Sequence, residues 1–572
     1  MGSKLYLIFA LLLSPFLVSA QLIQLNGKIL NAKNEPLSGA TVAVGGMARA
    51  LAANVEGRFT VSLEPGKKYT ITVSSVGYTT KSLDDVEVKP NEENTITVVL
   101  EENATLSEVV VRTSVRREST SALLNFQKNN TAVSSGIAAD FIRRTPDRNT
   151  GEILKRVSGT SIQDNKFVVV RGLGDRYNTA FLNGAQLPSS EPDRKSFSFD
   201  VIPASVVDNI IINKTATPDL TGEFAGGLIQ VTTKDVPSKN FLSIGATLGY
   251  NTISTFKDFK SNERGPSDWT GFTDGRRDLP AGFPANRAAY IGTNENPTSL
   301  AKKVEYSRLF RSDGYPERQV TAAPIQTYNV AWGVGKRLKN NASFGSVISV
   351  LYRKSENRAS VQRNLFDADA VAQQSYVDEQ NRYGINLGAM ANFSYVKGRH
   401  KVSFKNLFNR GYDDNYYSRS GPSIDRGGGM VNLWSSVLSL RTFYTGIFEG
   451  SHQLTNNGIR FNWNAGYSYN NKSQPDLRTA AYYQGEWDDD DSRRFFSDLR
   501  DHTFSGSASL AIPFNIGSEK QSLKLGGSGL LRFRDFKSRI FRYAEASGDF
   551  NQNYAFLPFD KIFATSNIAP DG

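Results

Sequence analysis

The side chains best suited to metal binding or catalysis are few in this chain. Its 572 residues include three histidines, no cysteine and one run of four aspartates, Asp488, Asp489, Asp490 and Asp491. The lack of cysteine excludes a disulfide scaffold, a thiolate zinc site, an iron–sulfur cluster and a cysteine nucleophile. The aspartates offer hard oxygen ligands that suit Ca²⁺. A solvated run of charges is the simpler explanation, and we predict no metal site there.

The histidines give no sign of a shared site. His400, His452 and His502 are widely spaced in the sequence, and none begins the His-x-x-Glu pattern of zinc peptidases. We therefore predict that they are interfacial or turn histidines. We also predict no catalytic residue, no cofactor and no enzymatic activity.

Two nucleotide-binding patterns can be set aside. Gly172 and Gly174 follow an apolar run, as in a dinucleotide-binding motif, but Tyr177 occupies the position of the third glycine. The sequence also has no G-x-x-x-x-G-K-[ST] loop, so energy from bound ATP is excluded.

Composition limits the class of protein. At roughly 150 residues per domain the length suggests about four domains. The chain has 67 Lys and Arg against 56 Asp and Glu. Its mean hydropathy is −0.38, and no apolar run long enough for a membrane helix follows the N-terminus. A helical membrane protein is excluded, whereas a membrane barrel is not, because its strands need only half as many apolar residues. We predict no nucleic-acid partner.

The N-terminus predicts export. Lys4 precedes an apolar run at 5–13, and Val18-Ser19-Ala20 is a small-residue cleavage site. We predict a signal peptide over 1–20; a buried first helix is the alternative.

Residues 21–102 predict a small β-sandwich. Turn signals at 34–36 and 65–67 separate short segments, and Tyr69, Ile71 and Val73 alternate with polar residues. A linker at 103–117 follows, with an apolar, β-branched segment at 106–111. This segment is either one more strand of the sandwich or a tether that adds to a partner's sheet.

Residues 118–236 predict a mixed α/β domain. Short helices are expected at 138–143 and 150–157 and a strand at 166–171. Further β-branched runs lie at 206–212 and 227–233.

From residue 237 to 572 the sequence alternates between apolar and small or polar residues. Such stretches occur at 241–251, 328–334, 383–395, 459–470, 504–512 and 523–533. Strands of about ten residues with this alternation are typical of a transmembrane β-barrel, with a lipid-facing and a lumen-facing side.

The connections between these strands alternate in length. Short ones are expected at about 337–342, 397–400, 451–458 and 513–521, and long ones at 252–325, 354–382, 410–436 and 471–501. Outer-membrane barrels have short periplasmic turns and long external loops, and the four aspartates would lie in one such loop. Nine strands can be counted, and single-chain bacterial barrels have an even number. We therefore expect the N-terminal portion of a larger barrel; a soluble all-β protein is the alternative.

Several segments carry a resemblance to known families. Residues 36–42 and 56–59 resemble the carboxypeptidase regulatory-like domain. The rest resembles the TonB-dependent outer-membrane receptors of Bacteroidota, in which a plug domain fills a barrel. The segments that match the plug are 151–159 (with Ser158 where proline is usual), 170–172, 182–184, 202–210 and 226–234.

The resemblance implies a fold and a set of partners. The chain would be mainly β: an N-terminal β-sandwich, an α/β plug and an antiparallel transmembrane barrel in the outer membrane, in contact with its lipids. The segment 106–111 lies where the TonB box is found. That box would be Leu106, Ser107, Glu108, Val109, Val110 and Val111. Residues 214–227 depart from the starch-utilisation branch, which argues against a SusD-type lipoprotein partner.

The resemblance also implies a function. The receptor would bind a scarce nutrient (a ferric chelate, haem, a glycan or a peptide) and import it with energy that TonB transmits from its inner-membrane complex. Plug–barrel contacts would come from Arg171, Arg176 and Lys214, paired with barrel carboxylates. Ligand contacts would come from Asp175, Arg176, Tyr177 and Asn178, and from the loop 189–195. The alternative is a barrel-anchored adhesin or sensor without import, in which deleting 106–111 would change nothing.

Overall fold

The computed structural model describes two compact units, Met1–Arg112 and Thr113–Gly572. The residues described are 22–32, 34–45, 50–76, 78–90, 92–101, 120–164, 166–218, 220, 222, 224–235, 237, 240–293, 296–310, 318–338, 342–517, 519–543 and 551–569. The predicted signal peptide and the predicted TonB box at 106–111 lie outside the described residues.

The first unit is the predicted β-sandwich. One sheet has the order β4-β1-β7 and the other β3-β2-β5-β6. Alternate residues of each strand point inwards, so Phe59, Val61 and Leu63 are buried while their neighbours are exposed. The strands are β1 Ile23–Asn31, β2 Thr41–Val44, β3 Leu51–Ala52, β4 Arg58–Leu63, β5 Tyr69–Ser74, β6 Lys81–Val86 and β7 Thr95–Leu100.

The second unit begins with the α/β domain, which we call the plug. A five-stranded sheet of order β12-β11-β14-β13-β8 forms its centre, and every residue of β13 is buried. Its elements are α2 Thr120–Asn129, β8 Ser134–Ala138, α3 Ala139–Ile142, α4 Thr150–Leu154, β9 Thr160–Gln163, β10 Phe167–Val170, η2 Asp175–Tyr177, β11 Asn178–Leu182, β12 Ala185–Gln186, η3 Phe199–Val201, η4 Ala204–Val206, β13 Val207–Asn213 and β14 Gly227–Thr233. The predicted helices and strands are confirmed; α2 was not predicted.

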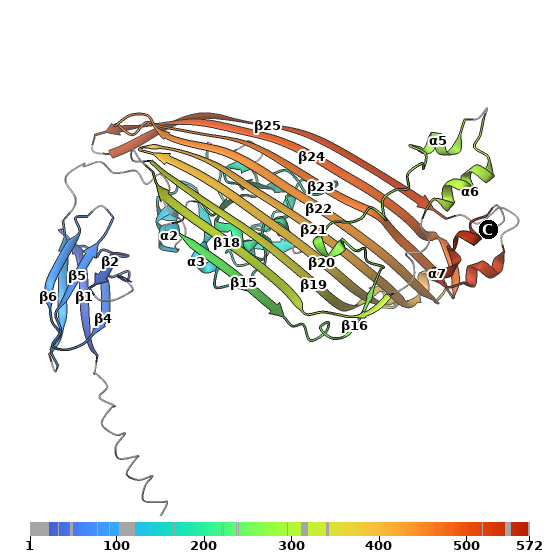
Figure 1. The fold of residues 1–572 in the computed structure, drawn as a ribbon, viewed down its shortest axis with the longest axis horizontal. Coiled ribbons are helices and arrows are strands. Elements are labelled where there is room, and N and C mark those ends of the chain that lie inside the picture. The colour runs from blue at the N-terminus through green and yellow to red at the C-terminus, as the bar shows by residue number, and fades with distance from the viewer. Residues whose placement is uncertain are drawn as a thin grey trace, which may run out of the picture. The chain divides into compact units, whose positions relative to one another are not determined.

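Nine antiparallel strands follow, in the order β15-β18-β19-β20-β21-β22-β23-β24-β25. We call this sheet the wall, and Figure 1 shows it as a long, twisted layer with the plug against one face. We call that face the inner face. The strands are β15 Phe241–Gly249, β18 Ile325–Arg337, β19 Ala342–Phe366, β20 Ala372–Lys397, β21 His400–Ser423, β22 Gly429–Gln453, β23 Arg460–Tyr483, β24 Glu486–Ile516 and β25 Glu519–Arg542. Among the described residues the strand count is confirmed, as are the short connections predicted at 397–400 and 451–458.

Three of the four predicted long loops are wrong. The segments 354–382, 410–436 and 471–501 are continuations of the strands, which turn at 367–371, 424–428 and 484–485. Cross-strand ion pairs, such as Arg358–Glu379 and Arg419–Asp378, support these extensions instead of apolar alternation. The four aspartates consequently lie in β24 and not in a loop.

The remaining long loop, 252–325, is confirmed and we call it the first loop. It contains β16 Asp258–Ser261, η5 Asp268–Thr270, α5 Arg287–Ile291, α6 Leu300–Arg308 and β17 Arg318–Thr321. After β25 the chain forms η7 Gln552–Phe556, α7 Phe559–Ile562 and η8 Thr565–Asn567. Among the described residues, no helix combines the length and apolar character needed to cross a membrane.

Candidate functional site

The plug and the inner face of the wall share an apolar centre. Wall residues Val347, Met390, Leu407 and Phe443 belong to the same buried cluster as the plug's core. The ring of Phe443 lies 5.5 Å from that of Phe197. Apolar contact alone would give a fixed, dry interface, but charged groups surround this centre.

The first charged contact is made by Asp200, which η3 places against β22. Arg441 Nη1 donates to the Asp200 carboxylate at 2.7 Å, and Nη2 donates to Asp413 of β21 at 3.2 Å. Burial alone would raise the pKa of Asp200, but the nearby positive charges of Arg441 and Lys166 lower it. Asp200 is therefore held ionised inside the interface.

The second contact is made by the loop that contains Glu191. Lys472 of β23 forms an ion pair with the buried Glu191 carboxylate. Arg534 of β25 donates to the backbone carbonyls of Ser189 and Glu191 at 2.9 and 3.1 Å, and also to Asp501 of β24 at 2.7 Å. Wall cations thus hold both the side chain and the backbone of this loop.

The third contact lies where the plug leads into the wall. Asp235 forms ion pairs with Lys401 and Lys405 of β21, and Asn392 of β20 donates to the carbonyl of Lys234 at 2.6 Å. Burial alone would raise the pKa of Asp235, but Lys405 and Lys401 lower it to about 2.

These contacts join acidic side chains of the plug to basic side chains of the wall. The sequence predicted that wall carboxylates pair with Arg171, Arg176 and Lys214. Within the part of the chain that the structure describes, these three side chains form hydrogen bonds inside the plug. Arg171 donates to the Gly226 carbonyl, Arg176 to the Tyr177 hydroxyl and Lys214 to Ser135 and the Ser158 carbonyl. In the ion pairs described above the plug supplies carboxylates and the wall supplies cations; a plug–wall role for Arg171, Arg176 and Lys214 stays a prediction. The sequence does contain a pattern that could have indicated these contacts. Basic residues occupy strand positions whose side chains point to the inner face: Lys401, Lys405, Arg441, Lys472 and Arg534.

The plug residues named in these wall contacts all belong to its second half. Asp200, Glu191 and Asp235 lie in this half, as does Gly184, whose carbonyl accepts from Asn464 of β23 at 3.3 Å. In the first half, 120–183, strand β8 pairs only with β13 at the edge of the plug sheet, whereas β11 lies between β12 and β14.

The predicted ligand residues do not form one site. Asp175 accepts from Ser196 at 2.6 Å, and Asn178 donates to the carbonyl of Val168 at 2.8 Å. Arg176 stacks on Tyr177, with the guanidinium 4.7 Å from the ring centre. Arg176 and Asn178 both line a cavity of about 210 Å³ beside β25, with Lys195 and Arg532 among its other residues. Their ligand role stays a prediction.

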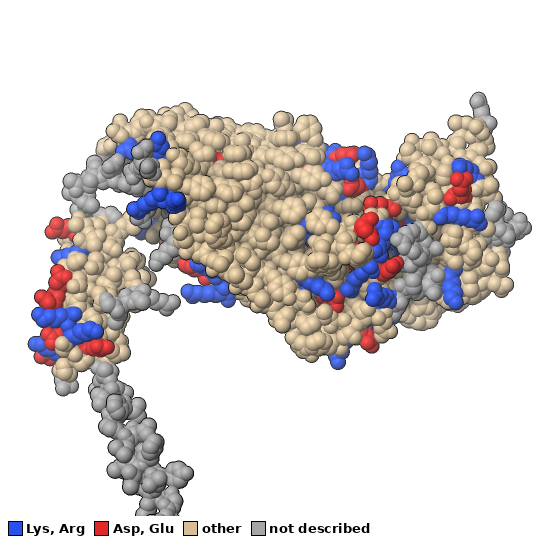
Figure 2. Space-filling model, viewed as in Figure 1, with Lys and Arg blue, Asp and Glu red and all other residues tan. Residues whose placement is uncertain are grey.

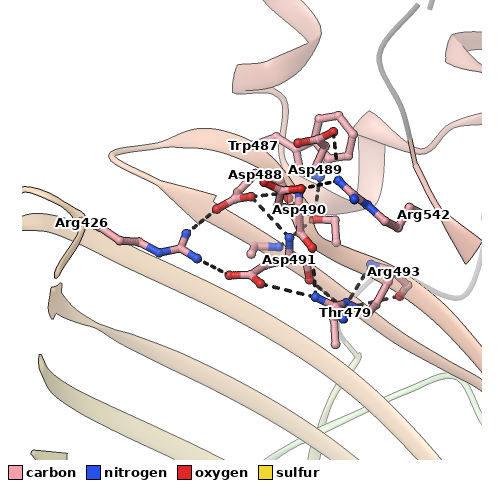
Figure 3. A network of polar contacts seen from close by, with 11 residues as sticks. Arg426, Thr479, Trp487, Asp488, Asp489, Asp490, Asp491, Arg493 and Arg542 are labelled. Atoms are coloured by element: carbon pink, nitrogen blue, oxygen red, sulfur yellow. Dashed lines mark hydrogen bonds and ion pairs between the residues drawn. The ribbon is translucent and has the colours of Figure 1, made fainter. Parts of the chain in front are cut away.

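The four aspartates are paired with arginines from the turn before β22 and from β25 (Figure 3). Arg426 pairs with Asp488 and Asp491, and Arg542 pairs with Asp489 and Asp490. The run therefore forms part of an ion-pair network that ties β24 to the turn before β22 and to β25.

Two histidines that are far apart in the sequence are neighbours in space. His400 and His452 face each other across β21 and β22, with their Nδ1 atoms 3.3 Å apart. Trp463 donates to Nε2 of His452 at 3.0 Å. One full hairpin separates them in the chain, so sequence spacing gave the wrong impression of their distance. His502 is elsewhere, bonded to the hydroxyl of Tyr467.

The contact at Asp235 leads to a pH prediction. A pKa lowered from 3.8 to about 2 corresponds to about 2 kcal/mol of plug stability. Because the folded-state pKa is depressed, this stabilisation is complete above the ordinary pKa and is lost as the pH falls from about 4 to about 2. We expect Asp235→Asn to lower the free energy of plug unfolding at pH 7 by about 2 kcal/mol. The difference in this free energy between variant and wild type should become smaller towards pH 2.

The measurement is denaturant unfolding of both proteins at a series of pH values. Asp164→Asn is the matched control, since its pair with Arg194 is exposed and long, at 3.3 Å, and should contribute little. The prediction would be contradicted if the loss of unfolding free energy in Asp235→Asn did not depend on pH. An equal loss in Asp164→Asn would contradict it too.

Two family descriptions match the chain. The CarboxypepD_reg-like domain matches residues 25–111, a stretch that includes 106–111, and the TonB-dependent Receptor Plug Domain matches residues 127–228. No curated protein matches the sequence.

The solved structures that match this chain are distant in sequence. The ferric citrate transporter FecA in its unliganded form is 11% identical, over 73% of this chain and 60% of that one, with a TM-score of 0.31. BauA, the ferric preacinetobactin receptor of Acinetobacter baumannii, is 11% identical, over 72% and 61%, with a TM-score of 0.32. The outer-membrane transporter YddB of Escherichia coli is 10% identical, over 71% and 54%, with a TM-score of 0.28. The chain thus spans about three fifths of the length of the first two.

Proposed function

We propose that this chain, which joins a carboxypeptidase regulatory-like domain to a TonB-dependent receptor plug and a nine-stranded wall, is an outer-membrane receptor. In this proposal it binds a scarce nutrient at the cell surface and imports it with energy transmitted by TonB. The observation that carries the proposal is the charged plug–wall interface, whose contacts come from the second half of the plug.

The outer face of the wall supports a place in the membrane. Figure 2 shows a broad region over the strands with few Lys, Arg, Asp or Glu, and charges gathered at the end where the long hairpins turn. Large apolar side chains are exposed on this face: Trp332, Val350, Tyr395, Val402, Phe448 and Phe504. Soluble monomers rarely expose so large an apolar surface, whereas a barrel strand crosses the membrane with about ten such alternating residues.

The interface supports a plug that opens in part. TonB would bind the segment 106–111 as an added strand and pull on the first half of the plug. α2 and the edge strand β8 would detach first, because β8 is hydrogen-bonded on one side only. The β8–β13 ladder joins five residue pairs, with hydrogen bonds of about 1 kcal/mol each. Several buried ion pairs hold the second half, and each buried charge left without its partner costs about 3–5 kcal/mol. Residues 184–235 would stay with the wall, and withdrawal of residues 120–183 would begin at β8. Strand β11, which is hydrogen-bonded to both β12 and β14, would leave last.

Cross-linking tests this function directly. With a photoreactive amino acid in place of Ser107, we expect illumination of intact cells to link the receptor to TonB. Thr60, exposed on β4 of the sandwich, is the control position and should give no such product. An adhesin or passive sensor would give no TonB product from either position, which would contradict the proposal.

A further inference from the structure

The first loop lies on the outer face of the wall, away from the plug. On β20, Asn392 faces the plug, so the odd-numbered residues face outwards. Phe259 of the loop packs on two of these, Tyr383 and Ile385, and on Tyr412 of β21. The loop therefore forms a second layer over the strand extensions.

Buried polar contacts fix this layer in place. Arg277 donates to both oxygens of Asp414 of β21 at 3.0 and 3.1 Å, and Asn262 donates to the same carboxylate at 3.0 Å. Arg264 donates to Glu356 of β19 at 3.0 Å. Buried ion pairs such as these stabilise a structure only when their geometry is well defined. The loop is therefore fixed in position against the wall.

The same loop region nevertheless leaves large apolar side chains exposed. Trp269 is 61% exposed and Phe272 is 46% exposed. Both are positioned by wall residues at one level: the hydroxyl of Tyr352 donates to the Trp269 carbonyl at 2.7 Å, and Arg410 lies 5.1 Å from the Phe272 ring centre. Three more exposed apolar residues lie where the chain leaves β15: Tyr250, Ile253 and Phe256.

The level of Trp269 matches the thickness of a membrane. Tyr352 lies about ten residues into β19, counted from its short-turn end at Ala342. Ten residues at about 3.3 Å each, tilted by about 45°, rise about 23 Å, close to the apolar band of about 25 Å in outer-membrane barrels. Outward-facing Val350, just below, is exposed and apolar, whereas Glu356, just above, is charged and covered by the loop.

We propose that Trp269 and Phe272, with the apolar residues at 250–256, rest in the outer-leaflet lipid at its interface with water. The first loop is then a membrane-seated clamp that sets how far the wall extends above the lipid. Tryptophan suits this place because its ring is apolar and its N–H is polar. The inference rests on the proposed outer-membrane location and adds the lipid surface as the partner of this loop.

Tryptophan fluorescence tests the proposal. The chain has five tryptophans, and a variant with Trp332, Trp434, Trp463 and Trp487 changed to Phe keeps only Trp269. In vesicles of phosphatidylcholine brominated near the headgroup, we expect its fluorescence to be quenched and blue-shifted; bromine near the chain end should quench less. Strong quenching by aqueous iodide without bromolipid quenching would overturn the proposal.

Two further variants make the outcome decisive. A variant that keeps only Trp332, on the outer face of β18, reports whether the wall is in lipid at all. Quenching of Trp332 without Trp269 overturns the clamp and leaves the membrane location standing; quenching of neither overturns the location itself. Phe366→Trp, placed at the far end of β19 in a chain without other tryptophans, should show no bromolipid quenching. If these variants fail to fold, Trp269→Phe alone should remove part of the bromolipid quenching of the otherwise unchanged chain, and no change would overturn the proposal.

Discussion

Arg441→Met is expected to loosen the plug from the wall by about 3–5 kcal/mol, because it leaves a buried carboxylate without its partner. Arg441 bridges Asp200 of the plug and Asp413 of the wall, and its side chain is 11% exposed. Methionine fills a similar volume, so the loss is mainly one of charge. Hydrogen exchange of the amides in β13 and β14 measures the effect, which should be about 100-fold or more in exchange rate.

The control is an exposed ion pair between an arginine and an aspartate. Arg500→Met removes a 2.7 Å pair with Asp498 in which Arg500 is 62% exposed, and should cost at most about 1 kcal/mol. Adding Asp200→Asn to Arg441→Met should recover part of the loss, since the uncompensated charge disappears. Equal effects of Arg441→Met and Arg500→Met would contradict the role given to the interface.

The alternation of apolar and polar residues predicted the wall well where strands cross the proposed membrane. There, one face meets lipid and the other meets the plug, so residues such as Phe404 and Lys405 must alternate. The short turns were equally visible, because glycine and polar residues interrupt the alternation, as at Gly398.

The same signal fails in the strand extensions. Arg363 and Arg419 both reach Asp378 across neighbouring strands, and pairs of this kind hold a ladder without an apolar face. A sequence shows charged residues there but not their partners, so the extensions looked like loops.

The sequence did not reveal the acidic residues that join the plug to the wall. Glu191 and Asp200 look like ordinary surface acids in the sequence, and only the fold places them against Lys472 and Arg441. Register decides such pairs, and a shift of one residue would turn each cation to the other face.

Locking the first half of the plug to the second is the other change with a large expected effect. Ser134 of β8 and Asn213 of β13 face each other in register, at the separation that cross-strand cysteines need. The chain has no other cysteine, so Ser134→Cys/Asn213→Cys forms one defined bridge. Force applied at 106–111 would then pass through β8 to the part of the plug that the wall holds.

A second bridge serves as the matched control. Thr233 of the plug and Asn392 of the wall are in contact, with Asn392 donating at 3.0 Å. Thr233→Cys/Asn392→Cys would tie the second half of the plug to the wall, which in our account never leaves it.

Uptake of the imported nutrient by cells carrying each bridge, before and after reduction, is the most direct test of the account. We predict that the 134–213 bridge abolishes uptake while surface binding persists, that reduction restores uptake, and that the 233–392 bridge has no effect. Normal uptake with the oxidised 134–213 bridge, or loss of uptake with the 233–392 bridge, would contradict a plug that opens by withdrawing its first half.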